Sequence, residues 1–351
     1  MILIFKKINF LSVLIFKVLK GFFKYAIGRG NSNETHQALI ELHCLTRGLS
    51  SFFLSKIYSW FRPIRTRNLE KPIGVLGDLT KDSENLIHVV DNLKKNGYHV
   101  FKNQLSPEII DSLLDFTKKN KALLRPEDGS PINSPIKLAF FDLNDPQTVR
   151  YEYSDHDLIL NPVIQKLMTD PSITAVARSY LQAEPLIDIV SMWWHTAYKA
   201  GPDSNAAQLY HFDLDRIKWL KYFFYLTDVT PDSGPHCFIQ GTHKPFSIPK
   251  SILKKGYARI EDIQVKSYYT EKDIIEFSGP VGTIIAEDTI GLHKGKHVIN
   301  GARLVFQLQF AIGMFGAPGF KPFQFKKSES GRLMDLKSHH PVLLSNINIV
   351  D

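Results

Sequence analysis

After Pro185 the sequence becomes a series of short β-rich runs separated by turn-forming clusters. The runs are LIDIVSMWWHTAY, AQLYHFD, WLKYFFYLTDV, HCFIQ, GTIIAED and ARLVFQLQFAI. Between them stand clusters rich in Gly, Pro, Asn and Asp, among them PDSG at 231–234 and SGPVG at 278–282. Many short strands that follow one another through tight turns predict an antiparallel sheet or barrel.

Helical patterns come before this β-rich half. We expect helices at 83–96, 106–120, 162–168 and 171–181, the second of them with Ser106 as N-cap and Pro107 at the first helical position. Helices followed by strands indicate an α+β protein. The clearest boundary is the polar stretch 62–82, and the expected organisation is therefore a segment 1–66, a main domain 67–325 and a polar, irregular tail 326–351.

The net charge of +8 is confined to the N-terminal segment. Residues 1–66 hold ten Lys and Arg against two Glu, and the remaining residues are balanced. A basic segment can bind nucleic acid, but the bulky aliphatic and aromatic side chains of residues 1–66 suit contact with lipid better than contact with phosphate. We therefore expect no nucleic-acid partner.

Residues 1–30 are strongly apolar, yet their uncharged stretch Ile8–Phe16 is about half of the ~20 residues that a membrane span needs. At helical spacing four lysines fall in one narrow sector: Lys6, Lys17, Lys20 and Lys24. This pattern predicts a basic amphipathic helix, either lying in a membrane interface or packed on the main domain with its lysines in water. A second apolar and basic stretch at 49–67 favours peripheral membrane contact, and no signal-peptide cleavage site follows the first.

Only two cysteines occur, Cys44 and Cys237, too few for a disulfide framework or a cysteine-ligated zinc fold. They suit a reducing compartment, and we expect a cytoplasmic protein, with the membrane surface as its more specific location. The sequence also lacks a P-loop, a Rossmann fingerprint and a G-x-S-x-G elbow.

One candidate metal centre lies in the β-rich half. His211 and Asp213 are two residues apart, and a strand places residues i and i+2 on the same face. His293 follows a strand and a turn further along the chain and supplies a third ligand. Two histidines and one carboxylate form the facial triad of non-haem Fe(II) oxygenases, which leaves three coordination positions open.

A strand after the Asn300-Gly301 turn completes this set. Arg303 shares one face of the strand with Val305, Gln307 and Gln309, while four apolar side chains form the other face. An arginine on a half-polar inward face is a natural bidentate clamp for a carboxylate. In a 2-oxoglutarate enzyme it would hold the distal carboxylate of the cosubstrate.

Together, the HxD motif, His293, Arg303 ten residues later and the segment FFYLTDVTPDSGPHCFIQGTHK resemble the phytanoyl-CoA dioxygenase family of Fe(II)/2-oxoglutarate oxygenases. The resemblance extends upstream to NGYHVFKNQLSPEIIDSL and covers roughly residues 85–315. It implies a double-stranded β-helix (jelly-roll or cupin-like) core flanked by helices, with Fe(II) at His211, Asp213 and His293 and 2-oxoglutarate at Arg303. It also implies O₂ as co-reactant and succinate and CO₂ as products.

The resemblance also brings in further residues. Phe223 matches a position where family members carry an aromatic residue beside the cosubstrate, and Gln208 matches a Gln near the metal; Gln208 could instead close a loop. Substrate-pocket candidates are Trp193, His195, Asp215 and Arg216. His297 is the rival third ligand, but it lies only six residues before Arg303. His243 is expected to order a turn.

The function that these features predict is a dioxygenase that hydroxylates a small-molecule or lipid-linked substrate, or carries out a related desaturation or cyclisation. Related halogenases lack the carboxylate ligand, and Asp213 therefore disfavours halogenation. The alternatives are a non-catalytic β-helix binding protein and a membrane-surface adaptor that acts through residues 1–66. The sequence leaves the oligomeric state open.

Overall fold

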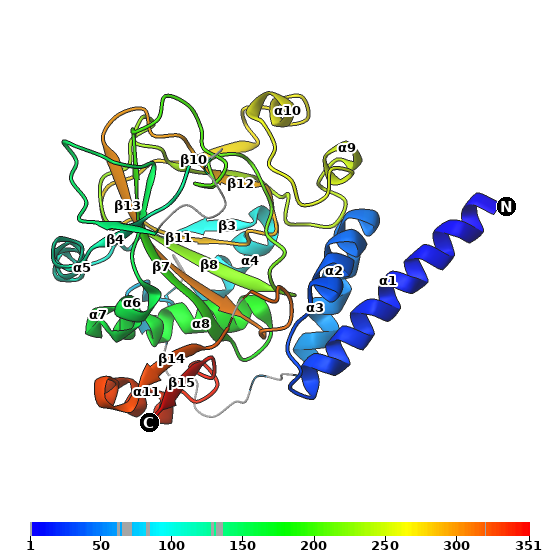
Figure 1. Cartoon of the computed structure of the whole chain (residues 1–351), viewed down its shortest axis with the longest axis horizontal. Helices are drawn as coiled ribbons and strands as arrows, with labels where there is room; N and C mark the ends of the chain where they lie inside the picture. Colours follow the sequence, from blue (N-terminus) through cyan, green and yellow to red (C-terminus); the bar gives the residue numbers. More distant parts are fainter. Residues whose placement is uncertain are drawn as a thin grey trace.

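The computed structural model describes residues 2–61, 64, 72–81, 85–127, 130, 136–319 and 321–351. It has mixed helices and strands around one large antiparallel sheet (Figure 1). The order of the eight strands is β3 (Tyr98–Val100), β11 (Ile284–Glu287), β8 (Trp219–Tyr225), β13 (Ala302–Ala311), β7 (Leu186–Thr196), β6 (Arg150–Glu152), β4 (Ala122–Leu124) and β5 (Lys137–Ala139). The predicted combination of helices with an antiparallel sheet is confirmed.

A smaller sheet faces the large one. It consists of β10 (Ile274–Phe277), β9 (His236–Ile239) and β12 (His293–Gly295), again antiparallel. Aromatic rings fill the space between the sheets: Phe238 of β9 meets Tyr98 of β3 at 6.0 Å, and His236 meets Phe223 of β8 at 4.4 Å between ring centroids. These contacts fix the distance between the two sheets and leave room for a site at one end.

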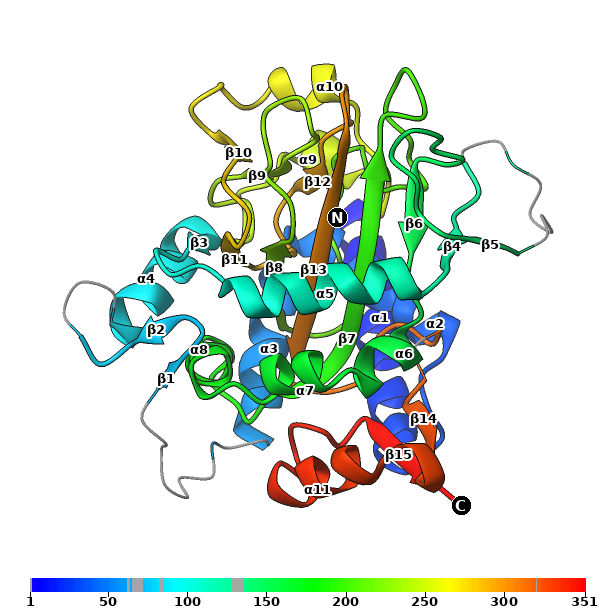
Figure 2. The same ribbon diagram turned by 90° about the vertical axis from the view of Figure 1, so that its left-hand side faces the viewer.

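The opposite face of the large sheet is covered by helices. Figure 2 shows α5 (Pro107–Lys119), α6 (Asp155–Leu160), α7 (Pro162–Met168) and α8 (Pro171–Leu181) across it. On β13 the alternation predicted from sequence sends Leu304, Phe306, Leu308 and Phe310 into this helix-covered core, where all four are fully buried. Removing them from water is the main favourable term that holds helices and sheet together.

The predicted helices are found with small differences at their ends. The helices at 162–168 and 171–181 match α7 and α8, and α5 begins at Pro107 as predicted. Ser106 stands at the N-cap position of α5, but its hydroxyl caps no backbone N–H of the helix. Helix α4 (Leu86–Asn96) is shorter than predicted, because Asn85 caps it by accepting from the N–H of His88; residues 82–84 lie outside the described residues.

Two predictions about regular structure were wrong. The AQLYHFD run is extended but makes only single bridges, because Tyr210 pairs with Ile260 while His211 pairs with His293. The tail beyond Lys326 is ordered: η2 (Lys327–Glu329) and α11 (Gly331–His339) lead to β15 (Ile347–Val350), which pairs in parallel with β14 (Phe323–Lys326). Its few apolar residues explain this, since Leu333, Leu344 and Ile347 are fully buried.

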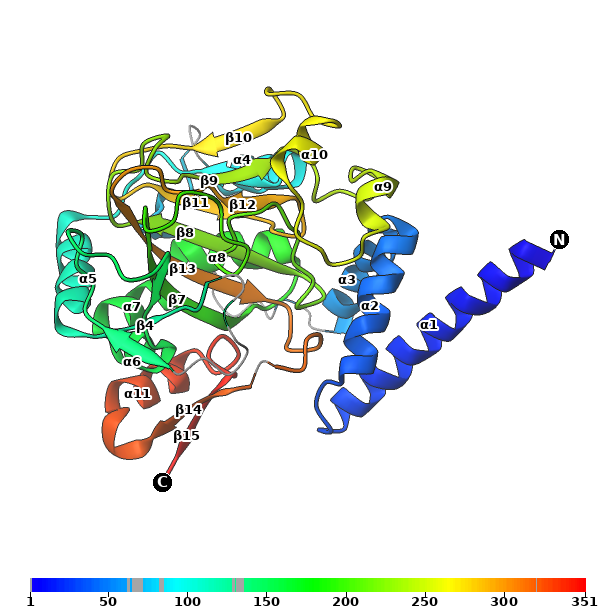
Figure 3. The ribbon, with the colours of Figure 1, turned by 45° about the horizontal axis from the view of Figure 1, so that its top comes forward.

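Three N-terminal helices pack on one side of this body: α1 (Ile2–Ala26), α2 (Asn33–Thr46) and α3 (Leu49–Phe61). Helix α1 is the outermost element, and its N-terminal half extends away from the rest (Figures 1 and 3). Its C-terminal half is anchored by Phe22, whose ring lies 5.3 Å from that of Phe315. Within the described part of the chain, no helix is long and apolar enough to cross a membrane.

The remaining elements are short. Strands β1 (Ile73–Gly74) and β2 (Gly77–Asp78) form a small hairpin next to α8, and α9 (Lys250–Leu253) and α10 (Asp262–Lys266) lie in the connection between the two strands β9 and β10. Helix α9 contacts α2 and so links the N-terminal helices to this connection.

The turn at 231–234 gives a test of the fold. Gly234 has φ +77°, and a Cβ there would lie 2.6 Å from the carbonyl oxygen of Lys296; Gly241 has φ +79° with open space around it. In both Gly→Ala variants the alanine must adopt the left-handed region, which lowers the free energy of unfolding by about 1 kcal/mol. We expect Gly234→Ala to lower it by about 2 kcal/mol more, because the backbone must also shift. Equal losses in urea unfolding would contradict the packing described for this turn.

Candidate metal centre and active site

Two histidines far apart in the chain are joined directly through their backbones. The N–H of His211 donates to the carbonyl of His293 at 3.0 Å, and the N–H of His293 donates to the carbonyl of His211 at 2.8 Å. In such a pair the side chains lie side by side, and the ring centroids are 4.3 Å apart. The N–H of Asp213 donates to the carbonyl of Thr289 at 2.9 Å and thereby holds the third residue of the cluster.

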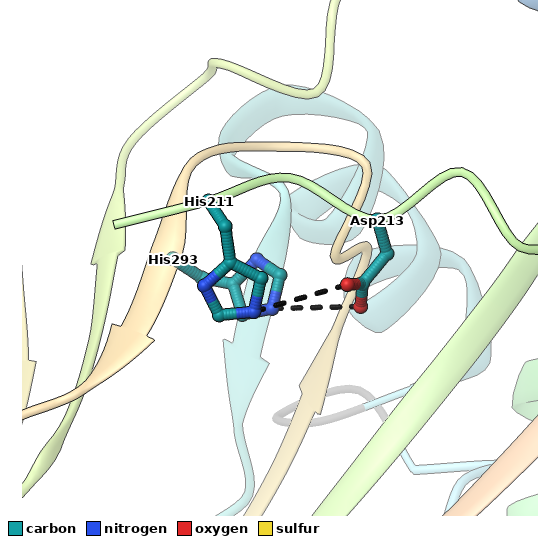
Figure 4. Close-up of side chains that lie close together, drawn as sticks. All are labelled: His211, Asp213 and His293. Carbon is teal, nitrogen blue, oxygen red and sulfur yellow. Dashed lines mark ion pairs between the residues drawn. The ribbon is translucent and has the colours of Figure 1, made fainter. Parts of the chain in front are cut away.

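The imidazoles are oriented by the backbone. Nδ1 of His211 lies 2.9 Å from the carbonyl of Leu209, and Nδ1 of His293 lies 3.0 Å from the carbonyl of Gly291. Because a carbonyl only accepts, each Nδ1 carries the proton and each Nε2 keeps a free lone pair. The two Nε2 atoms face the carboxylate of Asp213, at 3.8 Å for His211 and 3.5 Å for His293 (Figure 4).

These three residues offer ligand atoms that all lie within 4.8 Å of one another. The predicted His-Asp-His cluster is therefore present in the structure, with all three side chains buried. It is the only such cluster among the residues that the structure describes. His297 takes no part in it.

Burial and neighbouring charges set the protonation states of the cluster. Burial lowers the pKa of His293 to about 3 and that of His211 well below its usual value, so both rings are neutral near pH 7. Burial opposes the ionisation of Asp213, but the charge and hydrogen bond of Lys221, together with the neighbouring His293 and His211, outweigh burial and lower the pKa of this carboxyl. Two neutral imidazoles and one carboxylate are the protonation states that a divalent cation requires.

Lys221 holds Asp213 from the neighbouring strand. It lies on β8, is itself buried, and its Nζ donates to Oδ2 of Asp213 at 2.5 Å. Lys221 shares a strand face with Phe223, two residues further on, so both side chains point between the two sheets. The carboxylate is thereby fixed in position without being neutralised by a proton.

Arg303 lies on β13 directly opposite His195 of β7. Its side chain is 1% exposed, and Nη2 donates to Nδ1 of His195 at 3.1 Å. Nε and Nη1 are buried without a hydrogen-bond partner. A guanidinium in this state is costly unless an anion satisfies it, and the structure therefore presents a site for a carboxylate.

A cavity of about 300 Å³ connects these groups. Its wall includes the His-Asp-His cluster, Lys221, Arg303, His195, Phe223 and Trp193. Trp193, a predicted pocket residue, lines the cavity, whereas its neighbour Trp194 points to the other side and stacks on Phe141 at 4.0 Å in the core. Gly295 also lines it, and a Cβ there would stand 3.2 Å from Nη2 of Arg303.

Three sequence candidates lie elsewhere. The side-chain oxygen of Gln208 accepts from the N–H of Asp203 at 2.8 Å, so Gln208 closes a loop outside the cavity wall. Arg216 is turned away into a buried ion pair with Asp188 at 2.8 Å, and the backbone carbonyl of Asp215 accepts from Ala317 at 2.9 Å. Neither Asp215 nor Arg216 belongs to the cavity wall.

Sequence reasoning missed two groups of the cavity. Lys221 could have been noticed, because it is the single charge in the strand WLKYFFY and shares a face with Phe223. Arg150 of β6 gives no such signal; its guanidinium lies over the ring of Trp193 at 4.5 Å and lines the same cavity. His236 also lines the cavity and pairs with buried Glu287 at 3.0 Å.

Residues 93–297 match the family described as phytanoyl-CoA dioxygenase. The match spans more than half of the chain, and the chain belongs to this family. The family predicted from sequence is therefore confirmed. Among curated proteins, no relative matches the sequence.

Solved structures with a similar fold include HygX from Streptomyces hygroscopicus with nickel, 2-oxoglutarate and hygromycin B bound, at 13% identity and a TM-score of 0.46 over 65% of this chain and 88% of HygX. The epimerase SnoN in complex with Fe³⁺, alpha ketoglutarate and nogalamycin RO is 15% identical, with a TM-score of 0.43 over 64% of this chain and 83% of SnoN. The alpha ketoglutarate dependent carbocyclase SnoK from nogalamycin biosynthesis is 12% identical, with a TM-score of 0.45 over 71% of this chain and 90% of SnoK.

The role of Lys221 can be tested by Lys221→Met. In metal-free protein the change leaves the buried carboxylate of Asp213 without its cation. We therefore expect the free energy of unfolding to fall by about 3 kcal/mol. Added Mn²⁺ should raise the melting temperature of this variant more than that of the unaltered protein, because the metal ion replaces the missing charge.

Lys294→Met is the matched control, since buried Lys294 follows His293 on β12 but points to the other face of the strand, where it pairs with half-exposed Asp262. Its response to Mn²⁺ in thermal unfolding should equal that of the unaltered protein. An equal response in Lys221→Met would contradict the assigned role.

Proposed function

We propose that this protein is an Fe(II)- and 2-oxoglutarate-dependent dioxygenase that hydroxylates a small-molecule or lipid-linked substrate and releases succinate and CO₂. The observation that carries the proposal is a pair of features in one cavity. A buried cluster of two neutral imidazoles and a carboxylate shares its cavity with a buried guanidinium that lacks partners on two nitrogens.

The donor set fits iron. His211 and His293 offer lone pairs on Nε2, and Asp213 offers a carboxylate oxygen, all from one side. Such a two-histidine, one-carboxylate set suits Fe(II) and leaves positions open for other ligands. The Nδ1–H bonds to backbone carbonyls keep both rings in the orientation that coordination requires.

The cationic wall fits 2-oxoglutarate, which carries two carboxylates. Arg303 can receive the distal carboxylate on its guanidinium, where Nε and Nη1 lack hydrogen-bond partners. His195 holds the guanidinium from the side, and Gly295 keeps the space beside it free of a side chain. When bound, iron and this cosubstrate supply the O₂-dependent oxidation chemistry, with succinate and CO₂ as products.

The protein residues contribute orientation and exclusion of water. Phe223 and Trp193 form apolar parts of the cavity wall, and the Asp213 carboxylate is kept ionised and fixed by Lys221. Removing water from such a cavity strengthens each electrostatic contact inside it. Because Asp213 occupies the position that a halide ligand would need, hydroxylation, or a related desaturation or cyclisation, is favoured over halogenation.

The two facing sheets support the same proposal at the level of fold. We interpret them as the large and small sheets of a double-stranded β-helix, with the cluster at the end where β12 begins. In this arrangement His211, His293 and Arg303 come from different parts of the chain and still share one cavity.

The metal assignment predicts a loss of iron binding in His211→Ala. In an anaerobic titration with Fe(II) and 2-oxoglutarate we expect the visible charge-transfer band of the chelate in the unaltered protein, followed by succinate on adding O₂. Without one of three ligands the band and the succinate should both disappear.

His297→Ala is the control for this experiment, because His297 is close in sequence to the cluster but outside it. It should retain the band. No band and no succinate in the unaltered protein would instead favour a binding protein without this chemistry.

The cosubstrate assignment predicts a separate effect for Arg303→Ala. Removing one side of a buried carboxylate contact costs about 2–5 kcal/mol, so we expect the apparent KM for 2-oxoglutarate to rise at least about thirtyfold. Fe(II) binding in the absence of 2-oxoglutarate should remain. Arg178→Ala, which breaks a partly exposed pair with Glu184, is the control and should leave the KM unchanged. An unchanged KM in Arg303→Ala would show that the clamp is assigned to the wrong residue.

A further inference from the structure

The outward faces of α1 and α3 expose an unusual number of large apolar side chains. Nearly half of the exposed large apolar side chains in the described residues lie within the first 61 positions. On α1 they are Phe10, Val13, Ile15, Phe16, Leu19 and Phe23, and on α3 they are Phe52, Phe53, Ile57 and Trp60. We call these ten residues the outer apolar face.

Helix α1 is apolar on two sides. Leu14 and Val18 are 3% exposed, and they face the body of the protein together with Gly21, where a Cβ would collide with Thr35 of α2. The side turned away carries Phe16 and Leu19, which are 64% and 58% exposed. A helix on the surface of a globular protein normally has a polar outward face. The sequence of α1 therefore suits an apolar environment on its outer side as well.

The outer apolar face continues from one helix to the other. A groove of about 200 Å³ is lined by all three N-terminal helices, with Ile15 and Leu19 from α1, Leu42 and Thr46 from α2, and Phe53 and Ile57 from α3. Figures 1 and 3 show α1, α2 and α3 grouped on one side of the molecule, with α1 outermost. A contiguous exposed apolar surface of this kind marks an interaction site.

The charges on these two helices all have one sign. Neither 2–26 nor 49–61 contains Asp or Glu, while Lys20 and Lys56 are exposed next to the outer apolar face. Lys17 and Lys24 are partly exposed, and Lys17 pairs with Glu34 of α2 at 3.4 Å. The occupant of this surface must therefore be apolar within and anionic at its edge.

We propose that the outer apolar face lies in the interfacial layer of an anionic phospholipid bilayer, with α1 and α3 parallel to the membrane plane. Apolar side chains would enter the boundary between headgroups and acyl chains, and the lysines would contact anionic headgroups. Trp60, 79% exposed at the end of α3, has the amphipathic ring that is enriched at this depth. A second copy of the chain fits less well, because a symmetric contact would bring the two sets of lysines together.

The test is flotation of the full-length protein with vesicles of phosphatidylcholine that contain about 30 mol% phosphatidylserine. We expect the protein to float with these vesicles, and much less with phosphatidylcholine alone or at high salt. Ile57→Glu places a charge within the outer apolar face and should weaken vesicle binding at least about tenfold.

Ile263→Glu is the matched control. Ile263 lies on α10 and is 82% exposed, so the same substitution there adds the same charge away from the two helices. It should bind vesicles like the unaltered protein. Both variants change exposed positions, and equal melting temperatures would show that both are folded.

The charge requirement is tested separately with the pair Lys20→Glu and Lys24→Glu. We expect at least about tenfold weaker binding to the anionic vesicles, since each lysine near such a surface contributes about fivefold. The pair Lys118→Glu and Lys119→Glu on α5 is the control, and both of these lysines are about three-quarters exposed.

Three results would overturn the proposal. The first is an unaltered protein that stays with the lipid-free fraction, and the second is equal binding by Ile57→Glu and Ile263→Glu. The third is a dimer in light scattering that Ile57→Glu converts to a monomer while vesicles bind neither form, which would assign the surface to a second copy. Formation of succinate does not enter these outcomes, so this proposal and the dioxygenase proposal fail independently.

Discussion

The arrangement of the site depends on one pair of backbone hydrogen bonds, between His211 and His293. They join two segments that lie more than eighty residues apart, and they place two imidazoles side by side. Neither segment is part of a long strand at this point. These two hydrogen bonds, and the one that the N–H of Asp213 donates to Thr289, therefore set the distances between the ligand atoms. The two sheets hold the bonded segments in register.

The cavity contains this cluster and the cationic side chains of Lys221 and Arg303, of which only Lys221 pairs with a carboxylate. Lys221 is matched by Asp213, whereas Arg303 meets only the neutral ring of His195 among its hydrogen-bond partners in the structure. Burial lowers the pKa of His195, His211 and His293 and keeps these rings neutral. The positive charge of the cavity wall therefore comes from its lysine and arginine side chains. A cavity of this kind attracts an acidic small molecule, and it does so on the side where the guanidinium lies.

Local sequence patterns predicted the parts of this structure that depend on short-range rules. Such rules need only a few neighbouring residues. They predicted the helices α7 and α8, which begin with proline, the alternation along β13, and the spacing of His211 and Asp213. The order at the C-terminus and the absence of Asp215 and Arg216 from the cavity wall depend on contacts that are distant in sequence. Leu344 and Ile347 are buried by other elements, and Arg216 finds Asp188 on β7. Arg150 enters the cavity for the same reason, because β6 is placed by its pairing with β7.

Phe212 stands between the two ligands of the HxD motif and points to the other side of the segment. There it stacks with the ring of His43 from α2 at 5.6 Å and shares a buried cluster with Ile40. Burial lowers the pKa of His43 to about 4, so this stack is uncharged near neutral pH. The segment that carries His211 and Asp213 therefore lies between the cavity on one side and the N-terminal helix α2 on the other. A shift of that helix would reach the HxD segment by two contacts, the stack of His43 on Phe212 and the contact of His36 with the carbonyl of Leu214 at 3.2 Å.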